Sequence, residues 1–303
     1  MKNYWDNGVR LFWLDEAEPE YTVYDYDNYR YYLGSDQEVG NIYPVMYAKT
    51  FFDGMQQEGM KNPLNLLRCA WAGSAKYGTL VWSGDIGSTW ETFGRQIRAG
   101  LSMAVAGIPW WTTDIGGFHG ADIHDPKFHK LLVRWFEYGC FCPVFRLHGF
   151  RNPQVDMNRM DMISGVGSLG SGAENEVWSY GEDVFNIMKK YLQLRERMRP
   201  YIKSVMQNTH EKGDPVMRPL FYDFSGDANA WNVDDEYMFG PDVLVAPIYK
   251  EENKREVYLP AGAKWNFGWD NKEYEGGQTI TIDTPIDEIP VFLKNGANIP
   301  IKG

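Results

Sequence analysis

Apolar runs alternate with amphipathic segments over the first two thirds of the chain, and this alternation predicts parallel strands joined by helices. Short aliphatic and aromatic runs predict five strands, at residues 9–14, 64–71, 79–85, 108–118 and 143–149. Apolar residues at helical spacing predict helices at 43–59, 88–106, 125–141 and 180–212, the last kinked or restarted at Pro200. Long polar loops are expected at 19–41 and 150–177.

Two of these helices carry recognisable N-terminal signals. Ser88 and Thr89 precede Glu91, in the order of a capping residue followed by a first-turn acid. Asp125 and Pro126 suit the N-cap and the first helical position, respectively.

The pattern changes near Gly213. Short apolar runs separated by glycine, asparagine and aspartate turns follow it, which predicts a small antiparallel β-sandwich. We therefore expect a strand-and-helix part at residues 1–213 and a β-domain at residues 214–303.

A polar residue ends each predicted strand of the first part. These residues are Asp15, Arg68, Asp85, Asp114 and His148. Functional residues gather at the carboxyl ends of the strands in a (β/α)8 barrel, so the sequence predicts part of such a barrel. A doubly wound sheet is the alternative, but the glycine-rich phosphate loop expected after its first strand is absent from the sequence.

Composition narrows the class of partner. The formal net charge is −11, which disfavours nucleic acid and anionic membranes as partners. The chain has 44% hydrophobic and 16% aromatic residues, enough for a large core and for rings that stack on sugars. Three cysteines without a Cys-x-x-Cys pair, and histidines without a metal-binding spacing, predict no disulfide framework, no metal site and no cofactor.

Asp15 and Asp85 are the candidate catalytic pair. Cleavage of a glycosidic bond with retention needs two carboxyl groups about 5–5.5 Å apart, one a nucleophile and the other a general acid and base. Trp82 flanks Asp85 and could desolvate it, while Arg68 is a candidate cation beside the nucleophile. The structural alternative for either aspartate is the N-cap of a following helix.

Asp114 and His148 are candidates for binding sugar hydroxyls, because a carboxylate and an imidazole together supply acceptors and a donor. Trp111 could stack on the face of the sugar ring, and a place in the core is the alternative for this residue. For His148 the alternative is a buried histidine whose hydrogen bonds are satisfied.

Five motifs in this order resemble glycoside hydrolase family 31: FWLDEAEPE, LLRCAW, WSGDIGSTW, WWTTDIGGF and FRLHGF. The resemblance covers nearly the whole chain. It implies the last five or so strands of the family's (β/α)8 barrel, followed by its proximal β-sandwich. It also implies a retaining, exo-acting hydrolase of α-linked sugars that works through a covalent glycosyl-aspartate.

Carried over by position, the resemblance makes Asp15 the nucleophile and Asp85 the general acid and base. Arg68, Asp114 and His148 match sugar-binding residues, and Glu18 matches an acid that supports the site. Glu16 and Ala17 replace the family's usual Met-Asn pair. The Glu-Pro-Glu ending is similar to α-xylosidases, so an α-xylosidase is expected. An α-glucosidase, an α-transglucosylase and a catalytically silent carbohydrate-binding fragment are the alternatives.

The resemblance also implies that a preceding β-sandwich, the first barrel strands and a distal β-domain belong to the complete enzyme. We therefore expect this chain to be a fragment whose exposed sheet edges favour either the remaining part of the enzyme or self-association. The expected substrate is an α-linked oligosaccharide or glycoside. The compartment stays open between cytoplasm and periplasm.

Overall fold

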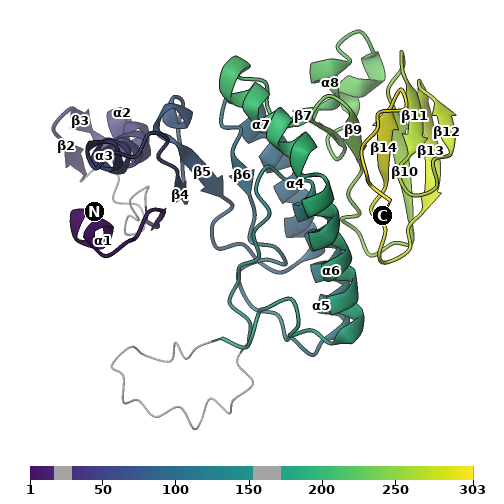
Figure 1. Ribbon diagram of the computed structural model, residues 1–303, viewed down its shortest axis with the longest axis horizontal. Helices are drawn as coiled ribbons and strands as arrows, with labels where there is room; N and C mark the ends of the chain where they lie inside the picture. Colours follow the sequence, from purple (N-terminus) through teal and green to yellow (C-terminus); the bar gives the residue numbers. More distant parts are fainter. Residues whose placement is uncertain (17–28, 153–171, 303) are drawn as a thin grey trace.

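The structure is a computed structural model that describes residues 1–16, 29–152 and 172–302. Figure 1 shows the N-terminal elements at one end of an elongated molecule and the C-terminal strands at the other, with four long helices between them. The first part alternates strands with helices, as the sequence predicts.

A parallel sheet of four short strands organises this first part. Its strands, in spatial order, are β1 (Phe12–Leu14), β4 (Asn65–Leu67), β5 (Thr79–Trp82) and β6 (Trp111–Thr112). Their register pairs Leu14 with Leu67, Leu67 with Val81, and Val81 with Trp111. The four carboxyl ends therefore reach the same edge of the sheet.

Helices cover the outer face of this sheet. Phe12, Leu14 and Leu67 pack with residues of α3 (Tyr43–Gln57), while Val81 and Trp111 belong to a larger core. That larger core includes α4 (Trp90–Val105), α5 (Pro126–Cys140), α6 (Glu182–Arg197) and α7 (Arg199–Lys212). The first part also contains α1 (Lys2–Asp6), β2 (Arg30–Tyr31), β3 (Gly34–Ser35), α2 (Asp36–Val39), η2 (Gly40–Ile42) and η3 (Ser74–Tyr77).

The helix signals of the sequence are confirmed. The Thr89 side chain accepts the Thr92 N–H at 3.1 Å and caps α4. Asp125 accepts the Lys127 N–H at 2.9 Å and caps α5, with Pro126 as its first residue. The long predicted helix is interrupted between α6 and α7, with Pro200 at the start of α7.

The predicted fifth strand at residues 143–149 is wrong as regular structure. Its segment lies beside β6, because the Val144 N–H donates to Trp111 O at 3.2 Å, but no strand is formed. Pro143 lacks an N–H, and no strand flanks the segment on its other side among the described residues. The Val144 bond joins this segment to β6, and a single backbone hydrogen bond does not make a ladder.

The C-terminal part is antiparallel, as expected. A six-stranded sheet has the order β12-β11-β14-β9-β8-β7, and β10 pairs with β13 in a second sheet. The bounds are β7 Met217–Pro219, α8 Leu220–Asp223, η6 Ala228–Asn232, β8 Tyr237–Phe239, β9 Val243–Val245, β10 Lys254–Leu259, β11 Lys264–Phe267, β12 Glu273–Glu275, β13 Gln278–Asp283 and β14 Val291–Lys294. The two sheets share one buried cluster, which makes them the layers of a sandwich.

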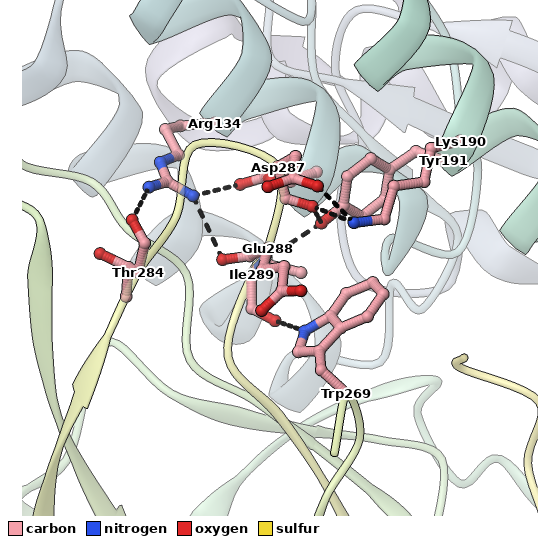
Figure 2. A network of polar contacts seen from close by, with 9 residues as sticks. Arg134, Lys190, Tyr191, Trp269, Thr284, Asp287, Glu288 and Ile289 are labelled. Carbon is pink, nitrogen blue, oxygen red and sulfur yellow. Dashed lines mark hydrogen bonds and ion pairs between the residues drawn. The ribbon is translucent and has the colours of Figure 1, made fainter. Parts of the chain in front are cut away.

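The two parts are joined by buried polar contacts as well as by a common core (Figure 2). Arg134 of α5 donates to the carbonyls of Thr284 at 2.7 Å and Glu288 at 3.2 Å, and pairs with Glu137 at 3.0 Å. Tyr191 of α6 receives the Ile289 N–H at 3.1 Å. The segment before β14 is therefore held against both helices, and the proposed boundary at Gly213 divides a continuous interior.

Candidate active site

The sheet register brings the predicted site residues to one edge. Asp15 follows β1 directly, Arg68 follows β4, and Trp82 ends β5. Asp114 comes two residues after β6. Because parallel strands end on the same side, residues far apart in the sequence become neighbours here.

Asp15 and Arg68 form an ion pair across neighbouring strands. The Arg68 Nη1 lies 3.4 Å from Asp15 Oδ1, and the Asp15 side chain keeps 45% of its surface exposed. The other described contact of the carboxylate is the Glu16 N–H, which donates to Asp15 Oδ1 at 2.9 Å. A cation and a backbone donor therefore both contact the carboxylate that follows β1.

Asp85 is not the N-cap of α4, because Thr89 occupies that position. It lies exposed in the loop after β5, at residues 83–89. That loop is joined to the loop after β6, since Ile86 O accepts the Phe118 N–H at 2.7 Å and the His119 N–H at 2.9 Å. The carboxyl group of Asp85 therefore does not cap α4, and it lies on a loop that is fixed by the neighbouring loop.

Asp114 is completely buried, and its Oδ1 pairs with Arg146 Nη1. Burial raises its pKa to about 6, against the opposing effect of Arg146, and the negative charge of Asp85 contributes in the same direction as burial. Its backbone N–H donates to Ser83 Oγ at 3.2 Å. The other carboxylate oxygen, Oδ2, is also buried and has no hydrogen-bond partner among the described residues, so one acceptor of Asp114 is left unsatisfied.

His148 lies in a cluster of rings. It stacks on Phe118 with centroids 5.7 Å apart and meets Trp13 edge-on at 5.6 Å. Burial and the positive charge of Arg146 lower its pKa, whereas the negative charges of Asp85 and Asp15 oppose this. The charges of both candidate catalytic aspartates therefore act on His148. The net lowering of its pKa favours the neutral imidazole at neutral pH.

The two predicted tryptophans lie on opposite faces of the sheet. Trp82 faces the ring cluster, with its centroid 5.9 Å from that of Trp13 and with the Arg146 guanidinium over its ring. Trp111 instead belongs to the core, where it packs against Gly100 of α4. A sugar contact for Trp111 is therefore corrected to the core position that the sequence left as the alternative. Glu18 lies outside the described residues.

Trp13 and Arg146 are site residues that the sequence analysis did not assign. Trp13 is 54% exposed at the centre of β1, while its neighbours Phe12 and Leu14 are buried against α3. The alternation of buried and exposed positions along β1 was the available signal, because it turns Trp13 toward the inner face. The pairing of Arg146 with Asp114 depends on the path of the irregular segment after Pro143, which the sequence does not reveal.

The edge therefore combines two exposed carboxylates, one buried carboxylate, two arginines, an imidazole and several aromatic rings. Such a set can bind a neutral polyhydroxylated ring, with acceptors for its hydroxyls and apolar faces for its carbons. No group of three or more acidic, histidine or cysteine side chains in the described ranges could hold a metal ion. In the same part of the chain, no helix is long and apolar enough to cross a membrane.

Comparison with known proteins agrees with this chemistry. The model of the glycosyl hydrolases family 31 TIM-barrel domain matches residues 1–205, and that of the family 31 C-terminal domain matches residues 213–299. The chain belongs to glycoside hydrolase family 31. The family assignment and the partial barrel followed by an antiparallel β-domain, both predicted from the sequence, are confirmed.

Three relatives of this chain are named as α-xylosidases or as a glucosidase. The chain is 55% identical to the solved structure of a family 31 α-xylosidase from a soil metagenome complexed with xylose, with a TM-score of 0.93 over 98% of this chain and 44% of that one. It is 33% identical to an α-xylosidase of Saccharolobus solfataricus over 100% of this chain and 39% of the relative. An uncharacterized family 31 glucosidase of Pseudescherichia vulneris is 60% identical over 51% of this chain and 29% of the relative. The chain thus spans less than half the length of each.

Proposed function

We propose that this chain forms the catalytic edge of a retaining, exo-acting α-glycoside hydrolase that removes α-linked xylose. The observation that carries the proposal is the common edge shared by Asp15, Asp85, Asp114 and His148, in a chain 55% identical to an α-xylosidase complexed with xylose. The substrate is an α-xylosyl oligosaccharide or glycoside.

In the proposed reaction Asp15 attacks the anomeric carbon while Asp85 donates a proton to the leaving oxygen. The bond to the leaving group breaks as a covalent bond between the sugar and Asp15 forms. Asp85, now a carboxylate, then takes a proton from a water molecule whose oxygen bonds to the anomeric carbon. The bond between the sugar and Asp15 breaks in the same step, which regenerates the Asp15 carboxylate and releases the sugar with its original α configuration. Arg68 contacts the Asp15 carboxylate and orients it for attack.

The ring cluster and the buried carboxylate supply the binding part of this proposal. Asp114 accepts a hydrogen bond from a sugar hydroxyl through its free oxygen, and neutral His148 offers one ring nitrogen as a donor or acceptor. Trp13 presents apolar surface to the carbons of the sugar ring, and the buried ring of Trp82 packs edge-on against it.

The edge of the sheet at β1 also bears on how the substrate pocket is formed. Val9 and Leu11 just before β1, and Trp13 within it, are exposed, and among the described residues β1 pairs on one side only, with β4. An uncovered parallel edge with apolar side chains is a surface for further strands. We propose that another segment of polypeptide, from the same protein or from a partner chain, pairs with β1 and completes the substrate pocket.

A second candidate, an α-glucosidase, is favoured by the 60% identity to the relative named a glucosidase. The two functions separate in one assay of the protein that carries this chain, with an aryl α-xyloside and an aryl α-glucoside compared by kcat/KM. Preference for the xyloside supports the first proposal, and preference for the glucoside supports the second. NMR of the first-formed sugar should show the α anomer.

The catalytic roles are tested by substitution. Asp15→Asn should lower kcat by about 10⁴-fold or more, as expected when one member of a catalytic set is removed. Asp85→Ala should lose much less on a substrate with a good leaving group, because such a group departs without protonation. Full activity of the Asp15 variant would exclude the assignment, and sugar binding without turnover in the parent would indicate a silent binding protein. Transfer of xylose to added sugars in preference to water would indicate a transglycosylase.

A further inference from the structure

Arg151 is a completely buried guanidinium next to the candidate active site, and the proposed mechanism gives it no role. Its Nη1 donates to Gly117 O at 2.8 Å and its Nη2 to Ile115 O at 3.1 Å. Both carbonyls belong to the loop after β6, residues 113–119, which carries Asp114 and Phe118. One side chain therefore holds the backbone on either side of Gly116.

The third nitrogen of Arg151 reaches a different segment. Its Nε donates to Asn175 Oδ1 at 3.2 Å and to Tyr180 Oη at 3.1 Å, just before α6. Asn175 in turn donates to Gly149 O at 3.2 Å, next to His148. The guanidinium is thus the junction between the loop of Asp114 and the segment of His148.

The chain leaves room for this group. A Cβ at Gly116 would lie 2.9 Å from the Arg151 Nη2, and one at Gly149 would lie 2.7 Å from its Nη1. The guanidinium also lies over the Phe128 ring, 4.9 Å from its centroid. The socket therefore fits a planar, forked cation, a shape that lysine does not reproduce.

All of these hydrogen-bond acceptors are neutral. Within residues 1–16, 29–152 and 172–302, no carboxylate forms an ion pair with Arg151. A buried charge with no counter-charge beside it has no opposite charge to cancel its field. Because little water surrounds it, that field reaches neighbouring groups with little screening. Its positive charge lowers the pKa of both His148 and Asp114.

We propose that Arg151 is a positioning residue for this site, and this inference rests on the proposed function. Its fork fixes the Asp114–Phe118 loop relative to His148, so that the stacked Phe118 and His148 rings meet the sugar in one arrangement. The positive charges of Arg151 and Arg146 both favour the neutral form of His148, whereas the negative charges of Asp15 and Asp85 favour its protonated form. Displacing a site by about 1 Å from a distance can cost about 10²-fold in rate, so the expected loss is of that order.

Two substitutions separate the fork from the charge. Arg151→Lys keeps the charge and loses the fork, whereas Arg151→Gln removes the charge. Arg195→Gln is the matched control, because Arg195 is a partly buried arginine that also donates to carbonyls, those of Cys140, Cys142 and Pro143, at 2.6, 2.7 and 2.8 Å. Arg195 does not contribute to the shift of the His148 pKa.

The first measurement does not need turnover. NMR titration follows the five histidines of the protein, with His148→Gln assigning the signal of His148. Arg151→Gln should raise the His148 pKa and change its chemical shift, since stacking on Phe118 sets a ring-current contribution. Arg151→Lys should change that chemical shift while leaving the pKa near its original value. Arg195→Gln should change neither, although it lowers the melting temperature.

The second measurement is steady-state kinetics on the sugar substrate. Both Arg151 variants should lose about 10²-fold in kcat/KM, and the acid limb of the pH profile should move only in Arg151→Gln. An unchanged His148 signal in both folded variants would overturn the inference, even if the parent is an active hydrolase. Should Arg151→Gln not fold, an unchanged His148 chemical shift in Arg151→Lys would overturn it alone. An inactive parent with the expected NMR changes would reject the proposed function and leave the positioning role intact.

Discussion

Arg68 Nη1 lies 3.4 Å from Asp15 Oδ1, and the two side chains leave neighbouring parallel strands at the same edge of the sheet. Fifty-three positions (68 − 15) separate them in the sequence. The pair places a fixed cation beside the carboxylate that we propose as the nucleophile.

Removing this cation should slow the reaction with the sugar. Arg68→Met should lower kcat/KM by about 10²–10³-fold, the range found when one electrostatic donor is lost from an active site. Arg68→Lys should lose less, because it keeps the charge. Arg95→Met is the control, since Arg95 forms only an exposed ion pair with Glu91 on α4. Equal activity of the Arg68 and Arg95 variants in the same assay would contradict a role for the pair.

The buried carboxyl of Asp114 predicts an acid limit to activity. Its pKa is raised from 3.8 to about 6 by burial, so the carboxyl takes up a proton as the pH falls through 6. The protonated form no longer pairs with Arg146 as an anion or accepts through both oxygens. We expect kcat/KM to fall below about pH 6, measured as a pH profile.

Asp114→Asn tests the origin of that limit. The amide cannot ionise, so the variant should have lower activity overall and should lose the acid limb near pH 6. Retention of the limb in the variant would assign it to another group. An unchanged KM for the sugar would argue against contact between Asp114 and the substrate.

Trp13 should contribute to binding through its exposed ring. Trp13→Ala removes the ring that meets Trp82 and His148, and we expect about a tenfold loss in kcat/KM, from an aromatic contact of about 1.5 kcal/mol. Trp13→Phe should recover part of it. Trp231→Ala in the β-domain is the control, because its indole is similarly exposed, at 57%, and stacks on Phe221 away from the candidate site. Comparable losses in the two alanine variants would point to a general effect on folding.

The buried pair Arg134 and Glu137 should control stability rather than catalysis. Arg134→Met leaves a buried carboxylate and two carbonyls without their donor, so we expect a loss of about 3–5 kcal/mol in the free energy of unfolding. Lys130→Met, which breaks only an exposed contact with Glu251, should change it little. Denaturant unfolding followed by circular dichroism measures both, and similar values for the two would contradict the importance of the buried contacts.

Glu137 also predicts how that stability varies with pH. Burial raises its pKa from 4.5 to about 7 in the folded protein, so the folded state binds the proton more tightly than the unfolded state. Its contribution to the free energy of unfolding therefore falls as the pH rises from about 4.5 to about 7. Glu137→Gln should remove this slope. A slope that persists in the variant would mean that other groups cause it.

Gly117 should tolerate no side chain. It adopts φ of +82°, and a Cβ there would lie 2.6 Å from the Cα of Ser88, where the loops after β5 and β6 meet. Gly117→Ala should therefore destabilise the protein and lower activity together. Gly59→Ala is the control, since Gly59 has φ of +94° with nothing within 4 Å of its Cβ position. If both variants have the same melting temperature, the loss of stability comes from backbone strain alone, and the close contact between the two loops contributes nothing.

The sequence located the strands of the sheet but extended most of them beyond their observed ends, because an apolar run marks a buried parallel strand better than it marks where the strand stops. Asp15 and Arg68 directly follow β1 and β4, whereas Asp85 lies in the loop beyond β5. The same uninterrupted pattern hides which face a side chain takes, and for this reason Trp111 was assigned to the wrong side of the sheet. In β1 the neighbours Phe12 and Leu14 are buried against α3, a packing partner that only the fold reveals, so Trp13 was not recognised as a site residue.

Segments without their own periodicity were the least predictable. Residues 143–149 have the composition of a strand, but strand formation depends on partners that the local sequence does not contain. The role of Arg151 depends on carbonyls at residues 115 and 117, whose positions follow from two loops and a helix terminus. Helix caps are local and leave a pattern in the sequence, but side-chain contacts to backbone atoms that lie far along the chain do not.

The interior that runs from α5 and α6 into the C-terminal sheets has a consequence for modularity. Tyr237 of β8 donates to Phe141 O at 3.1 Å inside that interior, and Arg134 reaches two carbonyls of the segment before β14. A β-domain taken from a distant homologue would pack correctly only together with helices whose surfaces match it. Recombination at the chain position where the two parts meet would therefore separate groups that must be inherited together.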